Sequence, residues 1–207
     1  MKKFFITGIG TDVGKTVVSA IFVEALKADY WKPVQAGDLD HSDTDKVKAL
    51  VSNPISRFHK NAYALNTPMS PHGAAEIDGI TIDTDDIEAP KASNHLVIEG
   101  AGGLLVPLND KQTLIELIKE DYAIIVVSRN YLGSINHTLM TLEVLKAHGL
   151  KPAGLIFNGE EVPSSESIIE QLGKVNVLGR INEEEQINAE VVSRYAELFK
   201  PSLEKLL

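Results

Sequence analysis

Short apolar runs rich in β-branched residues recur along the chain and predict its strands. Continuous runs of this kind, without polar alternation, are typical of parallel strands buried on both faces. Six segments have this pattern: 4–7, 30–34, 95–99, 123–128, 153–157 and 176–181. Glycine stands at or just beyond the end of four of them, at Gly8, Gly37, Gly100 and Gly159, as expected where a strand enters a turn.

The stretches between these segments have apolar residues three or four positions apart, which predicts helices. Two series show this spacing: Val17, Val18, Ile21, Phe22 and Ala25, and Ile135, Leu139, Leu142, Val144 and Leu145. A further helix is predicted over 190–200 and is expected to end before Pro201. The alternation predicts an α/β fold with a doubly wound, mostly parallel sheet and helices on both faces. Ligands of such folds bind at the carboxyl ends of the strands.

Composition narrows the possible functions. A chain of 207 residues is expected to form a single domain, residues 1–207. It has no cysteine, which excludes disulfides and thiolate metal sites and is typical of a cytoplasmic protein. The net charge of −9 argues against nucleic acid as a partner, and no apolar run is long enough to predict a membrane span. The acidic segment 76–93 is expected to be a solvated part of the surface.

The first predicted strand leads into a glycine-rich turn, 8–14, followed by Lys15 and Thr16 and a predicted helix. Backbone N–H groups of such a turn and the helix N-terminus can hold phosphates. Lys15 is expected to reach the β- and γ-phosphates, and the Thr16 hydroxyl to bind Mg²⁺. The loop is a variant, because Ile9 occupies the first glycine position of the usual phosphate-loop pattern. The dinucleotide pattern fits less well, since its third glycine would fall on Val13.

Carboxylates that could hold the metal ion follow two predicted strands. Glu99 ends one of them and precedes the flexible turn 100–103. The other group lies in segment 37–45, which contains four aspartates but has no EF-hand spacing. A solvated loop or a helix cap formed by Ser42 or Asp43 explains that group equally well. Between the later aspartates we favour Asp43 over Asp45, because Ser42 precedes it and the spacing of Val47 and Leu50 predicts a helix.

Lys32 lies in an apolar predicted strand, at a place where the chain should emerge beside the phosphate loop. A cation there could stabilise negative charge on a phosphoryl group in transfer or on an anionic acceptor. The alternative is a surface lysine whose aliphatic part packs on the protein. The six histidines lack the spacing of zinc ligands.

Taken together, several segments resemble the dethiobiotin synthetase family, and the resemblance extends over nearly the whole chain. The matching segments are 5–8 with 11–16, 32–34 with Gly37, 68–72 with 74–76, 99–103, and 132–137. The resemblance implies a phosphate-loop nucleotide-binding fold, Mg·ATP, and the substrates 7,8-diaminopelargonate and CO2. It also implies a homodimer whose active site is shared across the interface. The implied reaction forms a carbamate, phosphorylates it with ATP, and closes it into the cyclic urea of dethiobiotin.

The resemblance also implies roles for individual residues. Lys15, Lys32 and Thr11 would be catalytic, and Thr16, Asp43 and Glu99 would bind Mg²⁺. Nucleotide contacts would come from Asp12, Val13, Gly14, Lys15, Thr16, Val17, Asp43, Glu99, Gly100, Ala101, Gly102 and Asn158. Substrate contacts would come from Thr11, Lys32, Ala36, Gly133, Ser134 and Asn136. Ala36 departs from the family, which usually has a hydroxyl there, so one substrate hydrogen bond is expected to be missing. Asn182 stands where the family usually has proline, at the wall expected to bind the base.

Two other classes of function remain as alternatives. A switch ATPase of the partitioning or membrane-positioning kind would share the phosphate loop, but such proteins usually carry a second lysine where this chain has Thr11 and Asp12. A nicotinamide-dependent oxidoreductase is disfavoured by Val13 and by Lys32, which lies where an acid would bind the ribose.

Overall fold

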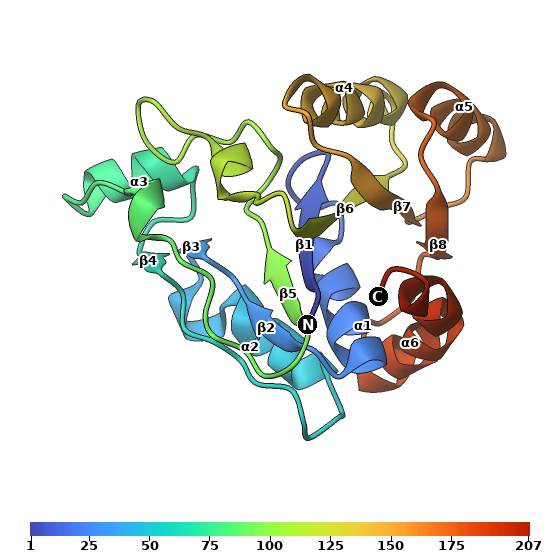
Figure 1. Ribbon diagram of the computed structural model, residues 1–207, viewed down its shortest axis with the longest axis horizontal. Coiled ribbons are helices and arrows are strands. Elements are labelled where there is room, and N and C mark those ends of the chain that lie inside the picture. The colour runs from blue at the N-terminus through green and yellow to red at the C-terminus, as the bar shows by residue number, and fades with distance from the viewer.

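The computed structural model describes residues 1–207 and is built around a six-stranded parallel sheet (Figure 1). In spatial order its strands are β2 (Asp29–Trp31), β5 (Leu96–Glu99), β1 (Lys3–Gly8), β6 (Tyr122–Arg129), β7 (Pro152–Asn158) and β8 (Val177–Ile181). The direction of the chain across the sheet reverses at β1, which pairs with β5 on one side and β6 on the other. The predicted α/β class with a parallel sheet is confirmed. A reversal of this kind is where ligands bind in such sheets.

Two layers of helices cover the sheet, as predicted (Figure 1). One face packs against α1 (Lys15–Leu26) and α6 (Ala189–Glu204), and the other against α4 (Ser134–Ala147) and α5 (Pro163–Gly173). Alternating residues of the strands supply the two cores. Phe4 and Ile6 of β1 belong to the α1 side, whereas Phe5 belongs to the α4 side. This alternation explains why the strands are apolar without interruption.

A small second sheet extends the molecule beyond β2. It consists of β3 (Val34–Ala36) and β4 (Tyr63–Leu65), with α2 (Asp43–Leu50) and α3 (Pro71–Ile77) beside it. The prediction of one strand over 30–34 is therefore wrong. Pro33 has no N–H for a ladder and restricts the backbone of Lys32, so the chain leaves the main sheet after Trp31.

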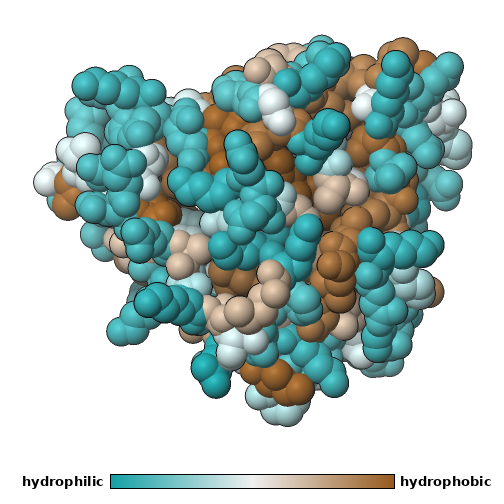
Figure 2. All heavy atoms as spheres, in the orientation of Figure 1, coloured by the Kyte–Doolittle hydropathy of each residue, from teal (hydrophilic) through white to brown (hydrophobic).

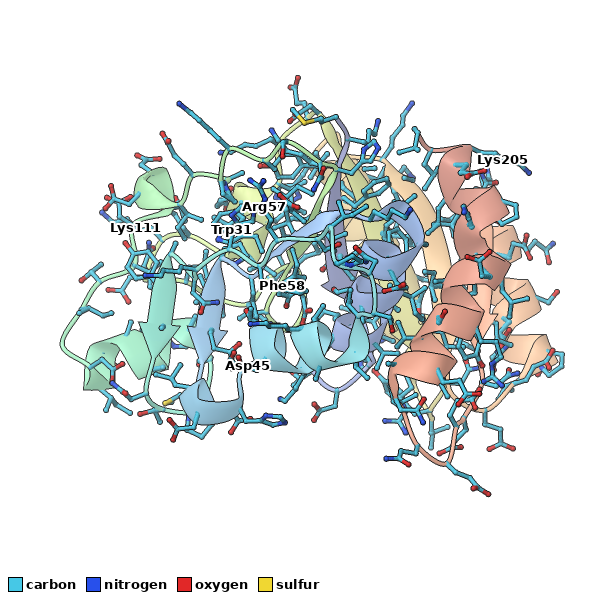
Figure 3. All side chains as sticks on the ribbon, turned by 90° about the horizontal axis from the view of Figure 1, so that it is seen from below. Trp31, Asp45, Arg57, Phe58, Lys111 and Lys205 are labelled. Atoms are coloured by element: carbon cyan, nitrogen blue, oxygen red, sulfur yellow. The ribbon has the colours of Figure 1, made fainter.

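A loop covers the outer edge of β2. The backbone N–H of Tyr30 donates to the carbonyl of Arg57, and that of His59 donates to the carbonyl of Tyr30. Figure 3, seen from below, shows Arg57 and Phe58 close to Trp31 in this part of the molecule. The loop thus provides hydrogen-bond partners for the backbone N–H and carbonyl of Tyr30 at the edge of β2, and this tyrosine is completely buried.

Helix α6 runs through Pro201 to Glu204, so the prediction that it ends before the proline is wrong. Proline removes one backbone hydrogen bond but leaves the last turn free to pack. Leu203, beyond Pro201, is completely buried in the core on the α1 side. This burial stabilises the last turn. Helices α3 and α5 and strand β4 were not predicted from the sequence.

Segment 76–93 combines exposed acids with buried anchors, so the prediction of a solvated surface is correct only for part of it. Ile82 is fully buried and Ile87 is nearly so, and both belong to the core on the α4 side.

None of the helices in the structure combines the length and the hydrophobicity that crossing a membrane requires.

Candidate active site

The phosphate loop connects β1 to α1 at the carboxyl edge of the sheet. Gly14 caps α1 with a φ of 99°, and a Cβ atom there would collide with the side-chain amide nitrogen of Asn158. Both the backbone angle and the close approach therefore require glycine. Lys15, the first residue of α1, folds back so that its Nζ donates to the carbonyl oxygen of Gly10 at 2.8 Å. The loop is thus closed around the N-terminus of the helix, as in a phosphate-binding turn.

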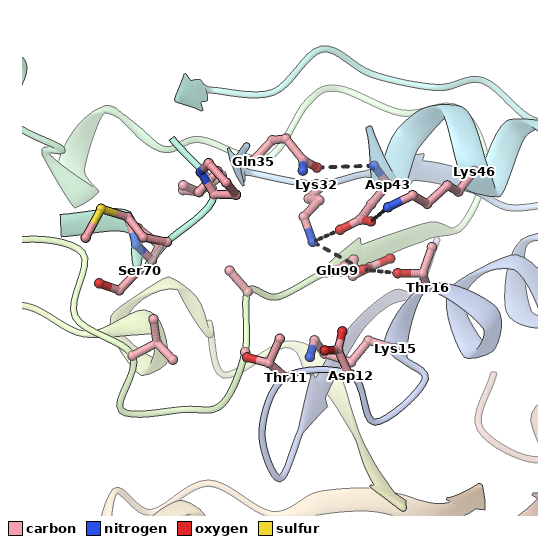
Figure 4. A pocket seen from close by; sticks show the side chains of 18 of the residues that line it. Thr11, Asp12, Lys15, Thr16, Lys32, Gln35, Asp43, Lys46, Ser70 and Glu99 are labelled. Atoms are coloured by element: carbon pink, nitrogen blue, oxygen red, sulfur yellow. Dashed lines mark hydrogen bonds and ion pairs between the residues drawn. The ribbon is translucent and has the colours of Figure 1, made fainter. Parts of the chain in front are cut away.

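Lys32 lies between two carboxylates at the same edge of the sheet (Figure 4). Its Nζ is 2.8 Å from Asp43 Oδ2 and 3.2 Å from Glu99 Oε1. The hydroxyl of Thr16 donates to the same Glu99 Oε1 at 2.9 Å. The side chains of Lys32 and Glu99 are almost completely buried, with 6% and 1% of their surfaces exposed. Lys32 is therefore not the surface lysine of the alternative interpretation.

Sheet order explains why residues distant in the sequence meet here. Glu99 is the last residue of β5, and β5 lies between β1, which leads into the phosphate loop, and β2, which leads into Lys32. Parallel strands all end at the same edge of the sheet, so the residues at or just after the ends of β1, β2 and β5 lie close together. Asp43 arrives separately, as the first residue of α2.

A capping box fixes the start of α2 and distinguishes the two aspartates. Ser42 is the N-cap, its hydroxyl accepts from the backbone N–H of Asp45, and Asp45 Oδ2 accepts from the backbone N–H of Ser42 at 3.0 Å. The carboxylate of Asp45 is therefore engaged in the cap, whereas that of Asp43 lies beside Lys32. The helix cap that the sequence suggested as an alternative is therefore present, and so is the contact of Asp43 with Lys32.

The two buried lysines differ in their ionisation. Burial lowers the pKa of Lys15 to about 8. Burial acts in the same direction on Lys32, but the carboxylates of Glu99 and Asp43 outweigh it and raise its pKa. Burial alone would raise the pKa of Asp43, and the ammonium of Lys32 reverses this and lowers it. Lys32 and Asp43 are thus both charged at neutral pH and form an ion pair.

A cavity of about 680 Å³ opens between the phosphate loop and the β3–α2 region. Twelve of the residues predicted for the site line it, and seven of these have polar or charged side chains: Thr11, Asp12, Lys15, Thr16, Lys32, Asp43 and Glu99. Ala36, Ala101, Gly102, Gly14 and Val17 also line it. The cavity is large enough for a small substrate beside the phosphates.

Sequence analysis missed several polar residues of this cavity. Gln35 accepts from the backbone N–H of Asp43 at 3.3 Å through its side-chain oxygen, and Lys46 donates to Asp43 Oδ1 at 3.1 Å. Ser70 faces the cavity from the far side (Figure 4). Lys46 could have been found, because it follows Asp43 by three positions on a predicted helix. No comparable signal marks Gln35.

The oxygen donors at this edge suit a magnesium ion. Thr16 Oγ1 and the carboxylates of Glu99 and Asp43 converge beside the phosphate loop. Mg²⁺ prefers such hard oxygen ligands, and it usually takes one or two carboxylates together with phosphates and water.

Other residues predicted for the site lie outside this cavity. Asn158, at the end of β7, donates from its side-chain amide to the carbonyl of Val13 at 2.9 Å, behind the phosphate loop. Gly133, Ser134 and Asn136 lie at the start of α4 and do not line the cavity. An apolar groove adjoins them, lined in part by Leu104, Leu105, Val106, Met140 and Val144.

Comparisons with known proteins agree with this geometry. The family described as an AAA domain matches residues 2–191. The chain is 60% identical over 202 residues to "ATP-dependent dethiobiotin synthetase BioD" of Christiangramia forsetii, covering 98% of both chains. It is 48% identical over 198 residues to the protein of the same name from Cytophaga hutchinsonii, covering 95% of this chain and 96% of that one.

Solved structures with a similar fold are much more distant in sequence. A putative plasmid partition protein from Borrelia burgdorferi has a TM-score of 0.62 at 12% identity, over 100% of this chain and 99% of that one. The cell division ATPase MinD of Pyrococcus furiosus has a TM-score of 0.59 at 16% identity, with both chains fully covered. These likenesses concern the fold alone.

Proposed function

The chain belongs to the family of ATP-dependent dethiobiotin synthetases, ligases of biotin biosynthesis, and we propose how its cavity performs their reaction. The substrates in this proposal are 7,8-diaminopelargonate, CO2 and Mg·ATP. Residues 1–207 act as one domain in the cytoplasm. The observation that carries the proposal is the buried Lys32 beside Glu99, on the same edge as Lys15 and Thr16.

The reaction needs positive charge at two places. One amine of the substrate attacks CO2 and forms a C–N bond, which gives a carbamate anion and releases a proton. A carbamate oxygen then takes the γ-phosphoryl group, and ADP leaves. The second amine attacks the carbamoyl carbon, phosphate leaves, and the ring closes to the cyclic urea. Both the carbamate and the phosphoryl group in transfer are anionic, so buried ammonium groups can stabilise them.

The two lysines divide this work in our proposal. Lys15 follows the phosphate loop, where its Nζ donates to the carbonyl of Gly10, and it would contact the β- and γ-phosphates of bound ATP. Lys32 is held charged by Asp43 and Glu99, on the side of the cavity that faces Ala36 and Thr11, and it stabilises the carbamate. Thr11 and Asp12 line the cavity on the side of the phosphate loop, next to Lys15 (Figure 4). The side chain of Ala36, which lines this part of the cavity, offers no hydrogen bond to the substrate.

Thr16, Asp43 and Glu99 are the residues that would hold Mg²⁺. When bound, the ion neutralises phosphate charge and orients the γ-phosphoryl group. The backbones of Val13, Gly14 and Val17 and the turn 100–102 complete the nucleotide site in this proposal. Asn158 binds the nucleotide base in this proposal. To do so, its side-chain amide would give up its hydrogen bond to the carbonyl of Val13 and bond to the edge of the base instead.

A second copy of the chain completes the site. The start of α4 presents backbone N–H groups without a partner at Gly133 and Asn136, which suit the carboxylate of the substrate, whereas the N–H of Ser134 between them donates to the carbonyl of Tyr131 at 2.9 Å. These residues do not reach the cavity of their own chain. The adjoining surface is apolar: Leu132 is fully exposed, and Leu105 and Met140 are each 56% exposed. Exposed apolar side chains that gather in this way are typical of an interface.

One incubation tests the function. The purified protein with Mg·ATP, bicarbonate and 7,8-diaminopelargonate should release phosphate only when the amine is present, and mass spectrometry should find the cyclic urea. Bicarbonate alone and DNA or lipid vesicles in place of the amine are the controls. Phosphate release that depends on DNA or lipid, without cyclic urea, would instead support a switch ATPase.

A further inference from the structure

Tyr30 is a completely buried tyrosine whose hydroxyl donates to Glu99 Oε2 at 2.8 Å. Sheet register explains the contact. Tyr30 of β2 lies opposite Val97 of β5, so Tyr30, Val97 and Glu99 point to the same face. Glu99 is two residues beyond Val97, about 6.6 Å further along the strand. The length of the tyrosine side chain spans this distance.

The two oxygens of Glu99 therefore have different partners. Oε1 accepts from Thr16 at 2.9 Å and faces Lys32 at 3.2 Å. Oε2 accepts only from Tyr30. Thr16 and Asp43 are the other residues expected to bind the metal ion. Because Thr16 contacts Oε1, and Lys32 joins Oε1 to Asp43, Oε1 is the oxygen on the side of the metal site. Oε2 points into the core, where Tyr30 packs against Val97 and Phe58.

We propose that Tyr30 is a positioning residue, which holds Glu99 so that Oε1 alone is presented to the metal ion. This inference rests on the proposed Mg·ATP site. Mg²⁺ takes one oxygen from each carboxylate in octahedral geometry, whereas Ca²⁺ readily accepts both oxygens of one carboxylate. By occupying Oε2, Tyr30 fixes the orientation of Glu99 and disfavours two-oxygen binding of a larger cation.

The test compares Tyr30→Phe with Tyr122→Phe in the full-length protein. Tyr122 is a partly buried tyrosine on β6, separated from β2 by β5 and β1, and its hydroxyl makes no hydrogen bond in the structure. Binding of Mn²⁺, as the probe for Mg²⁺, is measured by electron paramagnetic resonance on the complex with ADP. Substituting a residue that hydrogen-bonds and orients a metal-binding carboxylate typically lowers metal affinity about 10- to 100-fold. We expect a loss of that size in Tyr30→Phe and none in Tyr122→Phe.

Competition experiments give a second readout that a purely structural role would not change. Ca²⁺ should displace Mn²⁺ more readily from Tyr30→Phe than from the wild type, relative to Mg²⁺. Equal Mn²⁺ affinity and equal cation preference in the wild type and Tyr30→Phe, even with a lower melting temperature, would overturn the proposal. If wild-type protein adds nothing to the Mn²⁺ binding of ADP itself, the metal site of the proposed function is wrong, and this inference fails with it.

A measurement on the wild type keeps the proposal testable if Tyr30→Phe does not fold. The chain has five tyrosines, which can be labelled with ¹³C at the ring carbon that bears the hydroxyl. Adding Mg²⁺ to the ADP complex should shift the Tyr30 resonance, because neutralising Glu99 weakens the hydrogen bond that it accepts. The Tyr122 resonance should stay unchanged. An unshifted Tyr30 resonance would contradict the proposal.

Discussion

Lys15 and Lys32 show how the same residue type acquires two roles at one edge of a sheet. Lys15 has lost hydration and has no carboxylate in direct contact, so burial lowers its pKa to about 8. Lys32 is as deeply buried but contacts Asp43 and Glu99, which raise its pKa. A bound polyphosphate would give Lys15 a negatively charged partner, which Lys32 already has in Asp43 and Glu99.

Lys15→Gln should reduce turnover by several orders of magnitude while the fold remains intact. The substitution removes charge that is needed chiefly in the transition state. Steady-state kinetics and circular dichroism measure the two effects. Lys27→Gln, at the exposed far end of α1, is the matched control and should behave as the wild type. Near wild-type turnover in Lys15→Gln would contradict the mechanism.

Nucleotide affinity without divalent cations should depend on pH through Lys15. Phosphate binding raises the pKa of Lys15, so affinity is complete below the free-state value of about 8 and falls as pH rises above it. The decrease is at most about tenfold for each pH unit. Calorimetric titration of ADP in the presence of EDTA, from pH 7 to pH 9.5, measures it. Lys15→Arg, which stays charged throughout, should give a flat profile; a wild-type profile that is equally flat would refute the assignment.

At the scale of elements, the start of α2 determines which aspartate reaches the cavity. Ser42 and Asp45 satisfy each other's backbone N–H groups, so the helix begins at Asp43 and directs its carboxylate to Lys32. A helix beginning one residue later would direct a different side chain there. The cap is therefore both a structural element and part of the support of the site.

Ser42→Ala should destabilise the protein by about 1 kcal/mol, because an N-cap hydroxyl is lost. Urea denaturation measures the change in the free energy of unfolding. Ser52→Ala is the control: Ser52 is exposed just after α2, and its hydroxyl makes no hydrogen bond in the structure, so its effect should stay within about 0.5 kcal/mol. Equal effects of the two substitutions would show that the capping box contributes nothing to stability.

At the scale of the whole molecule, the surface beside the phosphate loop is unlike the rest. Figure 2 shows hydrophobic atoms gathered where the loops at the carboxyl edge approach α4. Leu105 and Met140 belong to this area, which adjoins Gly10 of the phosphate loop. An interface here would bring the α4 N-terminus of one copy close to the cavity of the other.

The protein should sediment at twice its chain mass of 22.5 kDa. Met140→Glu should shift this equilibrium toward the monomer and lower turnover at low protein concentration, because a charge enters the apolar groove. Binding of ADP should persist, since the nucleotide site lies within one chain. The control is Leu198→Glu, which also places a glutamate at an exposed apolar position. Leu198 lies on α6, on the opposite face of the sheet, and is 64% exposed, so this substitution should leave the mass unchanged. A monomeric wild type at working concentration would rule out a shared site.

Much of the architecture is determined locally and could be predicted from the sequence. Apolar runs mark the buried strands, because a strand covered on both faces has no polar positions. The turn 8–14 with Lys15 and Thr16 marks the phosphate loop, because Gly14 has a backbone that favours glycine and the Lys15 and Thr16 side chains suit phosphates and Mg²⁺. Even Glu99 could be singled out, because a carboxylate at the end of a parallel strand lies on the binding edge.

The tertiary structure alone decided the contacts between segments that are distant in the sequence. Tyr30 and Glu99 are 69 residues apart, and their hydrogen bond depends on β2 pairing with β5, which no local pattern specifies. Ser42 and the helical spacing favour Asp43 over Asp45 from the sequence, but only the position of Lys32 shows that the carboxylate of Asp43 belongs to the cavity. The last turn of α6 survives Pro201 because Leu203 meets a core formed by other elements. Residue patterns encode local conformation and burial, whereas pairing, charge neutralisation and packing depend on which surfaces the complete fold brings together.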